Sequence, residues 1–361
     1  MTERAGRPRT LRMPAPAALV PYRDAREFVL ARVSAVAPLH VPVSEALGKP
    51  LAERIVAAIP VPPHPLAGRR GIAVASHDLV GASPYSPVFL ASAPARVMPG
   101  DPLPPPADAV IEEQAVTSLH GVHEIGQGAY PGEGAVLPGF DIPQGAEIAG
   151  AGATVTPAIA LALAMAGTPT VAVRSPLVAL DDPQGDGGPE AFWLRTILRE
   201  HGCGVVSRGE GHVEILIRRD PRSVEGDAGG SAVGGVALNP GRDTRILWDG
   251  QRLTFVFPAR FDAVVAGFHA LIAPALAKLS NRRLRLVDRP LAAKIVSQVG
   301  LADLALLRSS ALGYEPLAVG ALSLEALIQA DAVGIVDPES EGAPAGAAFA
   351  ATPLKDVYAP S

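Results

Sequence analysis

Apolar and polar positions alternate with helical spacing in several stretches of the chain. Residues 22–37 carry apolar side chains on one face and charged ones on the other, which predicts a first amphipathic helix. Arg32 also falls on the apolar face, where its stem can pack while its charge reaches water. Thr156 and Pro157 predict the start of a helix over residues 157–166, and Gly167 predicts its end. A strand is expected directly afterwards, at residues 170–173.

Further along the chain, strand and helix patterns succeed one another. Residues 57–150 consist of short apolar runs separated by proline and glycine, which is typical of a small β-rich domain. Residues 176–285 alternate strands with helices and predict an α/β domain. One of its helices runs from Asp262 to Leu279, with Asp262 expected to cap it. From about residue 284 the pattern is β-like again, with one short helix near residues 322–330.

Composition and charge narrow the class of protein. The 361 residues suffice for several domains, and 48% hydrophobic with 19% charged residues is typical of a soluble globular protein. A net charge of -5 gives no electrostatic reason to expect a nucleic acid or membrane partner. The single cysteine, Cys203, excludes an internal disulfide framework and fits a reducing, cytoplasmic location.

No transmembrane helix is expected, because the richest apolar stretch, residues 151–173, is interrupted by proline and glycine. Residues 1–20 are basic, but the apolar stretch that follows the arginines is short and broken by prolines. We therefore expect a disordered lead-in at residues 1–20 and no targeting signal there.

Several segments stand in an order that points to one family. Residues 44–74 read SEALGKPLAERIVAAIPVPPHPLAGRRGIAV, residues 96–116 read RVMPGDPLPPPADAVIEEQAV, and residues 139–167 read GFDIPQGAEIAGAGATVTPAIALALAMAG. Residues 234–279 and 330–354 follow with NPGRD, FPARFDA and a closing strand pair. Taken in order, these segments resemble the molybdopterin molybdenumtransferases, the MoeA and gephyrin family, and the resemblance covers about residues 20–355.

The resemblance implies an elongated, multidomain α/β fold. Its centre would be a three-layer α/β molybdopterin-binding-like domain at residues 176–283, with a small β-rich domain inserted near the N-terminus at residues 57–138. Residues 21–56 and 139–175 would form a linker domain, and residues 284–355 a C-terminal β-domain. The family's subunits usually form dimers, so a homodimer is implied. A molybdoenzyme or another molybdenum-cofactor biosynthesis protein is a further expected partner.

The residues that would perform the family's reaction are largely replaced. Inserting molybdate into adenylylated molybdopterin needs a divalent cation, Mg²⁺, held on carboxylates near the phosphates. The family supplies some of these carboxylates from a D-N-S-A-M-D-G loop, where this chain has Pro65 and Arg70 in place of the aspartates. A threonine of the family's R-I-M-T-G turn is Pro99 here, which has neither a hydroxyl nor a backbone N–H.

The resemblance also implies candidate ligand-binding residues, each with a structural alternative. Pro240, Gly241, Arg242, Pro258 and Arg260 correspond to segments that line the family's pterin pocket, although the arginines could simply be solvated. Gly229, Gly230 and Ser231 could cradle a phosphate through backbone N–H groups, or belong to a flexible connection. Asp181, Asp182 and Asp186 could hold a metal cation, or form an ordinary turn.

Other polar residues have weaker functional interpretations. His64, Arg69 and Arg70 could bind phosphate or molybdate, although exposed basic loop residues are common. His120 and His123 form an H-x-x-H pair without a third ligand at metal-site spacing. Cys203 is expected to be a buried, small apolar residue and not a nucleophile.

Three functions remain open from the sequence. The favoured one is a non-catalytic relative that binds the cofactor or a partner protein during molybdoenzyme assembly. The second is an active molybdenumtransferase with a rearranged site, and the third is a protein that has kept only the fold. The family also has an S-G-G-V-S-V-G loop, which is missing here or compressed into residues 226–235, GDAGGSAVGG. The loss of this loop, of both loop aspartates and of the threonine favours the non-catalytic relative.

Overall fold

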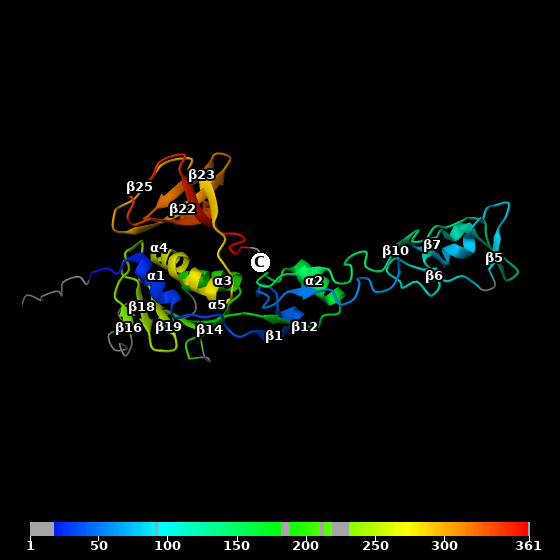
Figure 1. The fold of residues 1–361 in the computed structure, drawn as a ribbon, viewed down its shortest axis with the longest axis horizontal. Coiled ribbons are helices and arrows are strands. Elements are labelled where there is room, and N and C mark those ends of the chain that lie inside the picture. The colour runs from blue at the N-terminus through cyan, green and yellow to red at the C-terminus, as the bar shows by residue number, and fades with distance from the viewer. Residues whose placement is uncertain (1–17, 91–92, 182–187, 210–212, 219–230, 360–361) are drawn as a thin grey trace, which may run out of the picture. The chain divides into compact units, whose positions relative to one another are not determined.

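The computed structural model describes residues 18–90, 93–181, 188–209, 213–218 and 231–359. The chain divides into two compact units, one formed by Met1–Ala37 with Arg174–Ser361 and the other by Pro38–Val173 (Figure 1). Residues 1–17, which include most of the predicted lead-in, lie outside the described residues.

The unit formed by Pro38–Val173 begins and ends with the predicted linker residues. Strand β1 (Leu39–Pro42) pairs antiparallel with β12 (Thr170–Val173), and β2 (Ile55–Val56) pairs with β11 (Glu147–Ala149). Helix α2 (Pro157–Met165) starts as predicted, because the Thr156 hydroxyl accepts a hydrogen bond from Ile159 N at 3.2 Å. The predicted strand at residues 170–173 is confirmed as β12.

The rest of this unit is built from short antiparallel strands, as predicted for a β-rich domain. Its strands are β3 (Leu66–Ala67) with β10 (Ala135–Val136), the sheet β6-β4-β7 (Arg96–Val97, Gly71–Val74, Ala109–Ile111), and the sheet β5-β9-β8 (Val88–Leu90, Val122–Ile125, Val116–Leu119). Gly71 is required for the close approach of β4 and β7, because a Cβ there would lie 2.1 Å from the Ile111 carbonyl oxygen.

The other unit contains a six-stranded mixed sheet in the order β14-β13-β15-β19-β18-β16. The strands β14 (Gly204–Ser207), β13 (Leu177–Asp181), β15 (Ile215–Arg218) and β19 (Leu253–Val256) are parallel. The last two, β18 (Arg245–Trp248) and β16 (Ser231–Val233), continue the sheet antiparallel. The α/β domain predicted for this region is therefore present.

Helices cover one face of this sheet. Helix α1 (Tyr22–Leu30), α3 (Pro189–Glu200), α4 (Phe261–Gly267) and α5 (Ala273–Leu279) all contribute to one buried cluster with alternate residues of the strands, including Val178, Ile215 and Phe255 (Figure 1). The opposite strand residues form a separate small cluster around Ala179 and Leu216. Within the part of the chain that the structure describes, no helix contributes to that second cluster.

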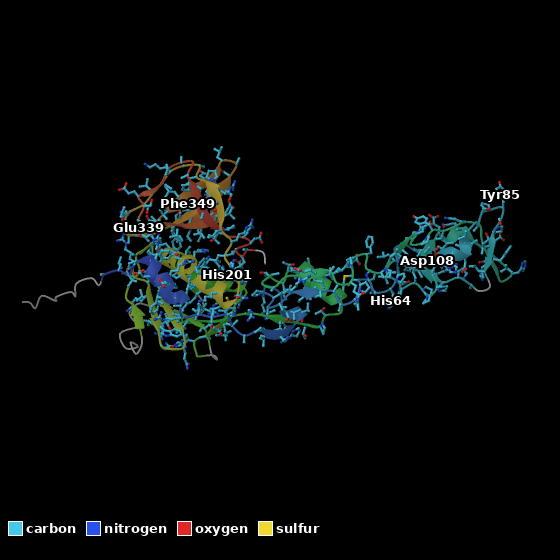
Figure 2. All side chains as sticks on the ribbon, viewed as in Figure 1. His64, Tyr85, Asp108, His201, Glu339 and Phe349 are labelled. Carbon is cyan, nitrogen blue, oxygen red and sulfur yellow. The ribbon has the colours of Figure 1, made fainter. Side chains whose placement is uncertain are left out.

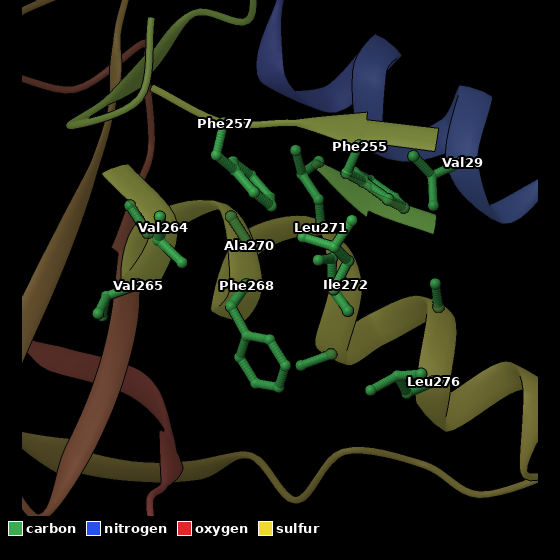
Figure 3. Packing of buried hydrophobic residues seen from close by; sticks show 14 of the residues in the cluster. Val29, Phe255, Phe257, Val264, Val265, Phe268, Ala270, Leu271, Ile272 and Leu276 are labelled. Carbon is green, nitrogen blue, oxygen red and sulfur yellow. The ribbon is translucent and has the colours of Figure 1, made fainter. Parts of the chain in front are cut away.

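Phe255 and Phe257 anchor the helical layer to the sheet. Their rings stack with centroids 6.3 Å apart, in the same buried cluster as Val264, Leu271 and Leu276 of the long helix (Figure 3). Gly267 permits this contact, because a Cβ there would lie 2.1 Å from Phe257 Cε1.

The long helix that contains α4 and α5 departs from the prediction in two places. It begins at Phe261, with Arg260 as its N-cap, so the prediction that Asp262 caps it is wrong. Residues Phe268–Ile272 form a wider turn before Pro274, whose ring excludes an ordinary α-helical turn there. The 19 residues Phe261–Leu279 are long and apolar enough to cross a membrane, but 83% of their most apolar window is buried in this core.

The first helix is shorter than the apolar pattern predicts. Helix α1 ends at Leu30, whereas the pattern extends to residue 37. Arg32 accounts for the early end, since its guanidinium lies 3.5 Å from the Phe28 ring centroid and donates to the Phe28 carbonyl at 2.9 Å. The arginine thus binds a backbone acceptor near the end of the helix and packs its stem on the apolar face, as expected.

The C-terminal β-domain contains a six-stranded sheet, a two-stranded sheet and a short helix. Its main path is β17 (Leu238–Asn239), β22 (Ala302–Ser310), β24 (Ala332–Val336), β26 (Ala348–Pro353) and β20 (Val287–Pro290), with β23 (Gly313–Val319) on β22 and β21 (Ile295–Val296) beside β25 (Gly342–Ala343). Phe349 packs into its core (Figure 2). The short helix predicted near residues 322–330 is α6 (Leu324–Gln329), capped by Ser323.

Candidate functional site

The parallel strands of the α/β domain end at one edge of the sheet, and polar residues gather there. The register places Asp181 opposite Arg218, Arg218 opposite Val256, and Val256 opposite Arg245. The loops that carry Arg208, Pro258–Arg260 and Pro240–Arg242 leave or reach the strands at this same edge. Open α/β sheets bind ligands at the carboxyl ends of their strands, so we call this edge the candidate site.

Asp181 lies between two arginines at this edge. Its Oδ2 accepts from Arg218 Nε at 2.9 Å and from Arg208 Nη1 at 3.0 Å. The Arg218 side chain is only 6% exposed, whereas that of Arg208 is 56% exposed. Asp181 therefore neutralises buried positive charge through its Oδ2 atom.

The other parts of the predicted metal site cannot be placed. Asp182 and Asp186 lie outside the described residues. Within the described residues, no group of three or more histidine, cysteine, aspartate or glutamate side chains could hold a metal ion. The described part of the candidate site thus offers guanidinium groups to an anion and no cluster of carboxylates to Mg²⁺.

Arg260 lies in the loop that joins β19 to α4. The Arg260 side chain is 73% exposed, and its Nε donates to both oxygens of Asp262 at 3.1 Å. Asp262 also accepts from Ala263 N at 2.8 Å, so the carboxylate holds the guanidinium against the first turn of the helix. Pro258 precedes this turn and is half-buried.

Arg242 lies in the turn that precedes β18. Gly241 has a φ of 121°, a conformation that favours glycine, and Thr244 N donates to its carbonyl at 2.9 Å. A Cβ at Gly241 would lie 3.8 Å from the Ala263 carbonyl oxygen, which places this turn beside the start of α4. Arg242 is exposed, and its side chain has no hydrogen bond or ion pair within the described ranges.

Ser231 lies at the edge of the sheet where the parallel strands begin, opposite the candidate site. It pairs with Trp248, which in turn pairs with Leu253 at the start of β19. Three residues of strand, about 10 Å, therefore separate it from the candidate site. Gly229 and Gly230 lie outside the described residues, so the predicted phosphate cradle has no structural support from Ser231.

The basic loop of the other unit is engaged in local contacts. Arg69 donates to the Val110 carbonyl at 2.7 Å and pairs with Glu133 at 3.2 Å, and Arg70 pairs with Glu113 at 3.0 Å. His64 is exposed (Figure 2). Pro99 occupies an exposed turn that Asp101 closes by accepting from Met98 N at 2.8 Å.

The histidine pair in the β-rich domain is separated by a turn. His120 has a φ of 50° in the turn between β8 and β9, and His123 Nδ1 lies 2.8 Å from the Ser118 hydroxyl. Within the described residues, no group of three or more potential metal ligands includes either histidine.

A buried polar cluster lies at the end of helix α3, away from the strand ends. His201 Nδ1 lies 2.5 Å from the Tyr358 hydroxyl, and Arg282 donates to the His201 carbonyl at 2.6 Å (Figure 2). Burial lowers the pKa of His201 to about 3 and that of His269 to about 4. Burial raises the pKa of Cys203 to about 12, so its thiol is inert at neutral pH, as predicted for a structural cysteine.

Arg208 and Arg218 were not among the residues expected from the sequence. The sequence nevertheless carries a signal for both arginines. Arg208 directly follows the apolar run GVVS, and Arg218 ends the run ILIR, and each run forms a parallel strand. An arginine at that position in successive strands points to an anionic ligand at the carboxyl edge.

An open hollow of about 560 Å³ lies against helix α1 and does not include the candidate site residues. It is open and lined by Tyr22, Arg23, Arg26 and Lys278, with Glu27, Leu30 and Ala31. Two of its cations already have partners, since Arg23 pairs with Asp337 at 2.6 Å and Lys278 donates to the Leu30 carbonyl at 2.8 Å. The strand ends therefore remain the better candidate site.

Comparison with known proteins is consistent with this architecture. Residues 20–167 match the family model of the MoeA N-terminal region (domain I and II). Two structures described as molybdopterin biosynthesis MoeA protein from Pyrococcus horikoshii are 23% and 20% identical, cover 94% and 93% of this chain and all of their own, and have TM-scores of 0.67 and 0.62. A molybdenum cofactor biosynthesis protein from Pyrococcus furiosus is 17% identical, with a TM-score of 0.57, over 92% of this chain and 99% of its own. No curated protein matches the sequence.

Proposed function

We propose that this chain binds molybdopterin without transferring molybdenum. Its residues 20–167 match the model of the MoeA N-terminal region, and its fold resembles that of MoeA structures over nearly its whole length. The observation that carries the proposal is the charge of the candidate site. Arg208, Arg218, Arg242 and Arg260 stand at the edge of the sheet where the parallel strands end, and Asp181 and Asp262 pair with three of them.

Such a site suits an anionic ligand. Guanidinium groups match the geometry of phosphate oxygens, and charge-assisted hydrogen bonds are the stronger class of hydrogen bond. The molybdopterin phosphate, or the diphosphate of its adenylylated form, supplies the required negative charge. Molybdenum insertion also needs a cation on carboxylates, and the described residues contain no cluster for it.

Two substitutions in the other unit support a non-catalytic role. Where the family has aspartates, this chain has Pro65 and Arg70, and Arg70 pairs with Glu113. A cationic side chain in place of a carboxylate repels Mg²⁺ and removes a metal ligand. A carrier or assembly factor that passes the cofactor to a molybdoenzyme, or to another molybdenum-cofactor biosynthesis protein, requires binding alone.

The alternative is an active molybdenumtransferase with a rearranged site. The decisive experiment incubates purified protein with adenylyl-molybdopterin, molybdate and Mg²⁺, and measures both AMP release and ligand retention. Retention without AMP release is the expected result. AMP release above a protein-free control would establish the alternative, and absence of both would leave only the fold.

Binding should depend on the arginines of the candidate site. Arg242→Gln and Arg260→Gln are each expected to weaken retention of adenylyl-molybdopterin by tenfold or more, since a charge-assisted hydrogen bond contributes about 1.5–3 kcal/mol. Arg308→Gln is the control, because Arg308 is also an exposed arginine and pairs with Glu315 in the C-terminal β-domain. Equal affinity of all the variants would place the ligand elsewhere.

A soluble, cytoplasmic homodimer is the proposed state of the protein. In its favour, helix α2 has no polar side chain, yet Leu161 is 62% and Met165 50% exposed. Helices that are apolar on all sides are normally buried, so this surface suits an interface with a second subunit.

A further inference from the structure

Asp303 is a buried carboxylate beside the Arg242 turn, although it belongs to the C-terminal β-domain. It is 3% exposed at the start of β22. Its Oδ1 accepts from Asn239 Nδ2 at 2.7 Å, and its Oδ2 accepts from the Ser297 hydroxyl at 2.6 Å and from Gln298 N at 3.4 Å. Both oxygens are therefore engaged, and the buried charge is stabilised by hydrogen bonds.

Asn239 is the residue directly before the turn Pro240–Gly241–Arg242. It forms β17 with Leu238, and this strand pairs parallel with β22 in the register Asn239 opposite Asp303. Ala302 N also donates to the Ala237 carbonyl at 2.9 Å. The C-terminal β-domain thus holds the chain on the N-terminal side of the turn.

The hydrogen bond between the Asn239 and Asp303 side chains is closely surrounded by other atoms. Gly320, with a φ of 66°, lies against it, and a Cβ there would come within 2.5 Å of both Asn239 Nδ2 and Asp303 Oδ1. Asn239 therefore cannot change its side-chain position freely. Arg242, by contrast, has no described partner of its own, so its location depends on the backbone of the turn.

We propose that Asp303 is a positioning residue: through Asn239 it fixes the turn that presents Arg242 to a phosphate-bearing ligand. Ligand binding at the strand ends is thereby coupled to the C-terminal β-domain. This inference rests on the proposed function for the ligand, but the ordering of the turn by Asp303 can be measured without any ligand.

The test uses the full chain and three variants. Asn239→Asp sets two carboxylates against each other and breaks the contact, while the double variant Asn239→Asp with Asp303→Asn restores a hydrogen bond in the reverse direction with the same buried charge. Asp331→Asn is the matched control, because Asp331 accepts from Ser309 N at 2.8 Å in the same domain, away from the turn.

The first readout is hydrogen exchange of the peptide that contains residues 239–244. Asn239→Asp should raise exchange there at least tenfold, including the Thr244 amide that donates to Gly241. The double variant should restore most of the protection, and the control should match the wild type. Unchanged exchange in Asn239→Asp would overturn the proposal, and so would a double variant that exchanges as fast as the single one.

The second readout is retention of adenylyl-molybdopterin. Asn239→Asp is expected to bind at least tenfold more weakly than the wild type, with recovery in the double variant.

The outcomes separate this inference from the proposed function. If the wild type does not retain the ligand while exchange changes as expected, the proposed ligand is wrong and the positioning of the turn still stands. If the wild type binds and Asn239→Asp binds equally well, the positioning role is refuted.

Discussion

Removing the carboxylate of Asp181 should destabilise the α/β domain far more than removing the exposed arginine that shares it. In Asp181→Ala, Arg218 keeps a guanidinium that is 6% exposed and loses its acceptor at 2.9 Å. Breaking a buried ion pair costs about 3–5 kcal/mol. Asp181 is itself 26% exposed and Arg218 makes a further interaction, so we expect about 3 kcal/mol, the lower end of that range.

Arg208→Ala supplies the matched comparison. It removes the other partner of the same carboxylate, but its side chain is 56% exposed, and an exposed pair contributes about 0–1 kcal/mol. A double variant, Asp181→Leu with Arg218→Met, should be less destabilised than Asp181→Ala, because the buried guanidinium is then removed together with its carboxylate.

Tryptophan fluorescence in urea isolates the effect. The chain has two tryptophans, Trp193 and Trp248, and both lie in the unit that contains the α/β domain. Their transition therefore reports this unit and not Pro38–Val173. If Asp181→Ala and Arg208→Ala lowered the free energy of unfolding equally, the assignment of Asp181 to a buried ion pair would be refuted.

Three further predictions follow from the described contacts. The unit that contains the α/β domain should lose stability as the pH falls from 6.5 towards 4, because His201 and His269 stay neutral in the folded state and bind protons in the unfolded state. By pH 5 the loss in free energy of unfolding is roughly 2 kcal/mol per histidine. Urea unfolding followed by tryptophan fluorescence measures this loss, and a urea midpoint that does not change with pH would contradict the prediction. Asp108, labelled in Figure 2, accepts hydrogen bonds from Ser76 N at 2.7 Å and from the Ser76 hydroxyl at 2.8 Å, so Asp108→Asn should destabilise the β-rich domain by about 1–3 kcal/mol. Hydrogen exchange at residues 72–76 measures this loss, and unchanged protection of these amides would disprove the prediction. Leu161→Glu should raise the monomer fraction in light scattering if α2 is an interface, whereas a wild-type monomer would refute the homodimer.

The hydrogen bonds from Ser76 also change the pKa of the Asp108 carboxyl. Burial raises the pKa of this carboxyl, but the hydrogen bonds from Ser76 outweigh it and hold the pKa below its usual value. Its contribution to stability is therefore present above about pH 4 and is lost as the pH falls further.

The sequence by itself determined where most elements lie, because their signals are local. Thr156 and Pro157 start α2, apolar runs mark the strands, and the order of segments pointed to a resemblance to the MoeA family, whose N-terminal model matches residues 20–167. The loss of the family's aspartates at Pro65 and Arg70 is likewise visible in the sequence alone. These features depend on residues within a few positions of one another.

Tertiary structure decided which residues share a site, because strand register joins positions far apart in the chain. Asp181 and Arg218 are 37 residues apart and form an ion pair, which the sequence analysis did not anticipate. Strand register also places Ser231 at the edge where the parallel strands begin, away from the candidate site. It brings Asp303 beside Asn239, although the two residues are 64 positions apart in the chain. Local spacing cannot encode such pairings, since they follow from the order in which strands pack.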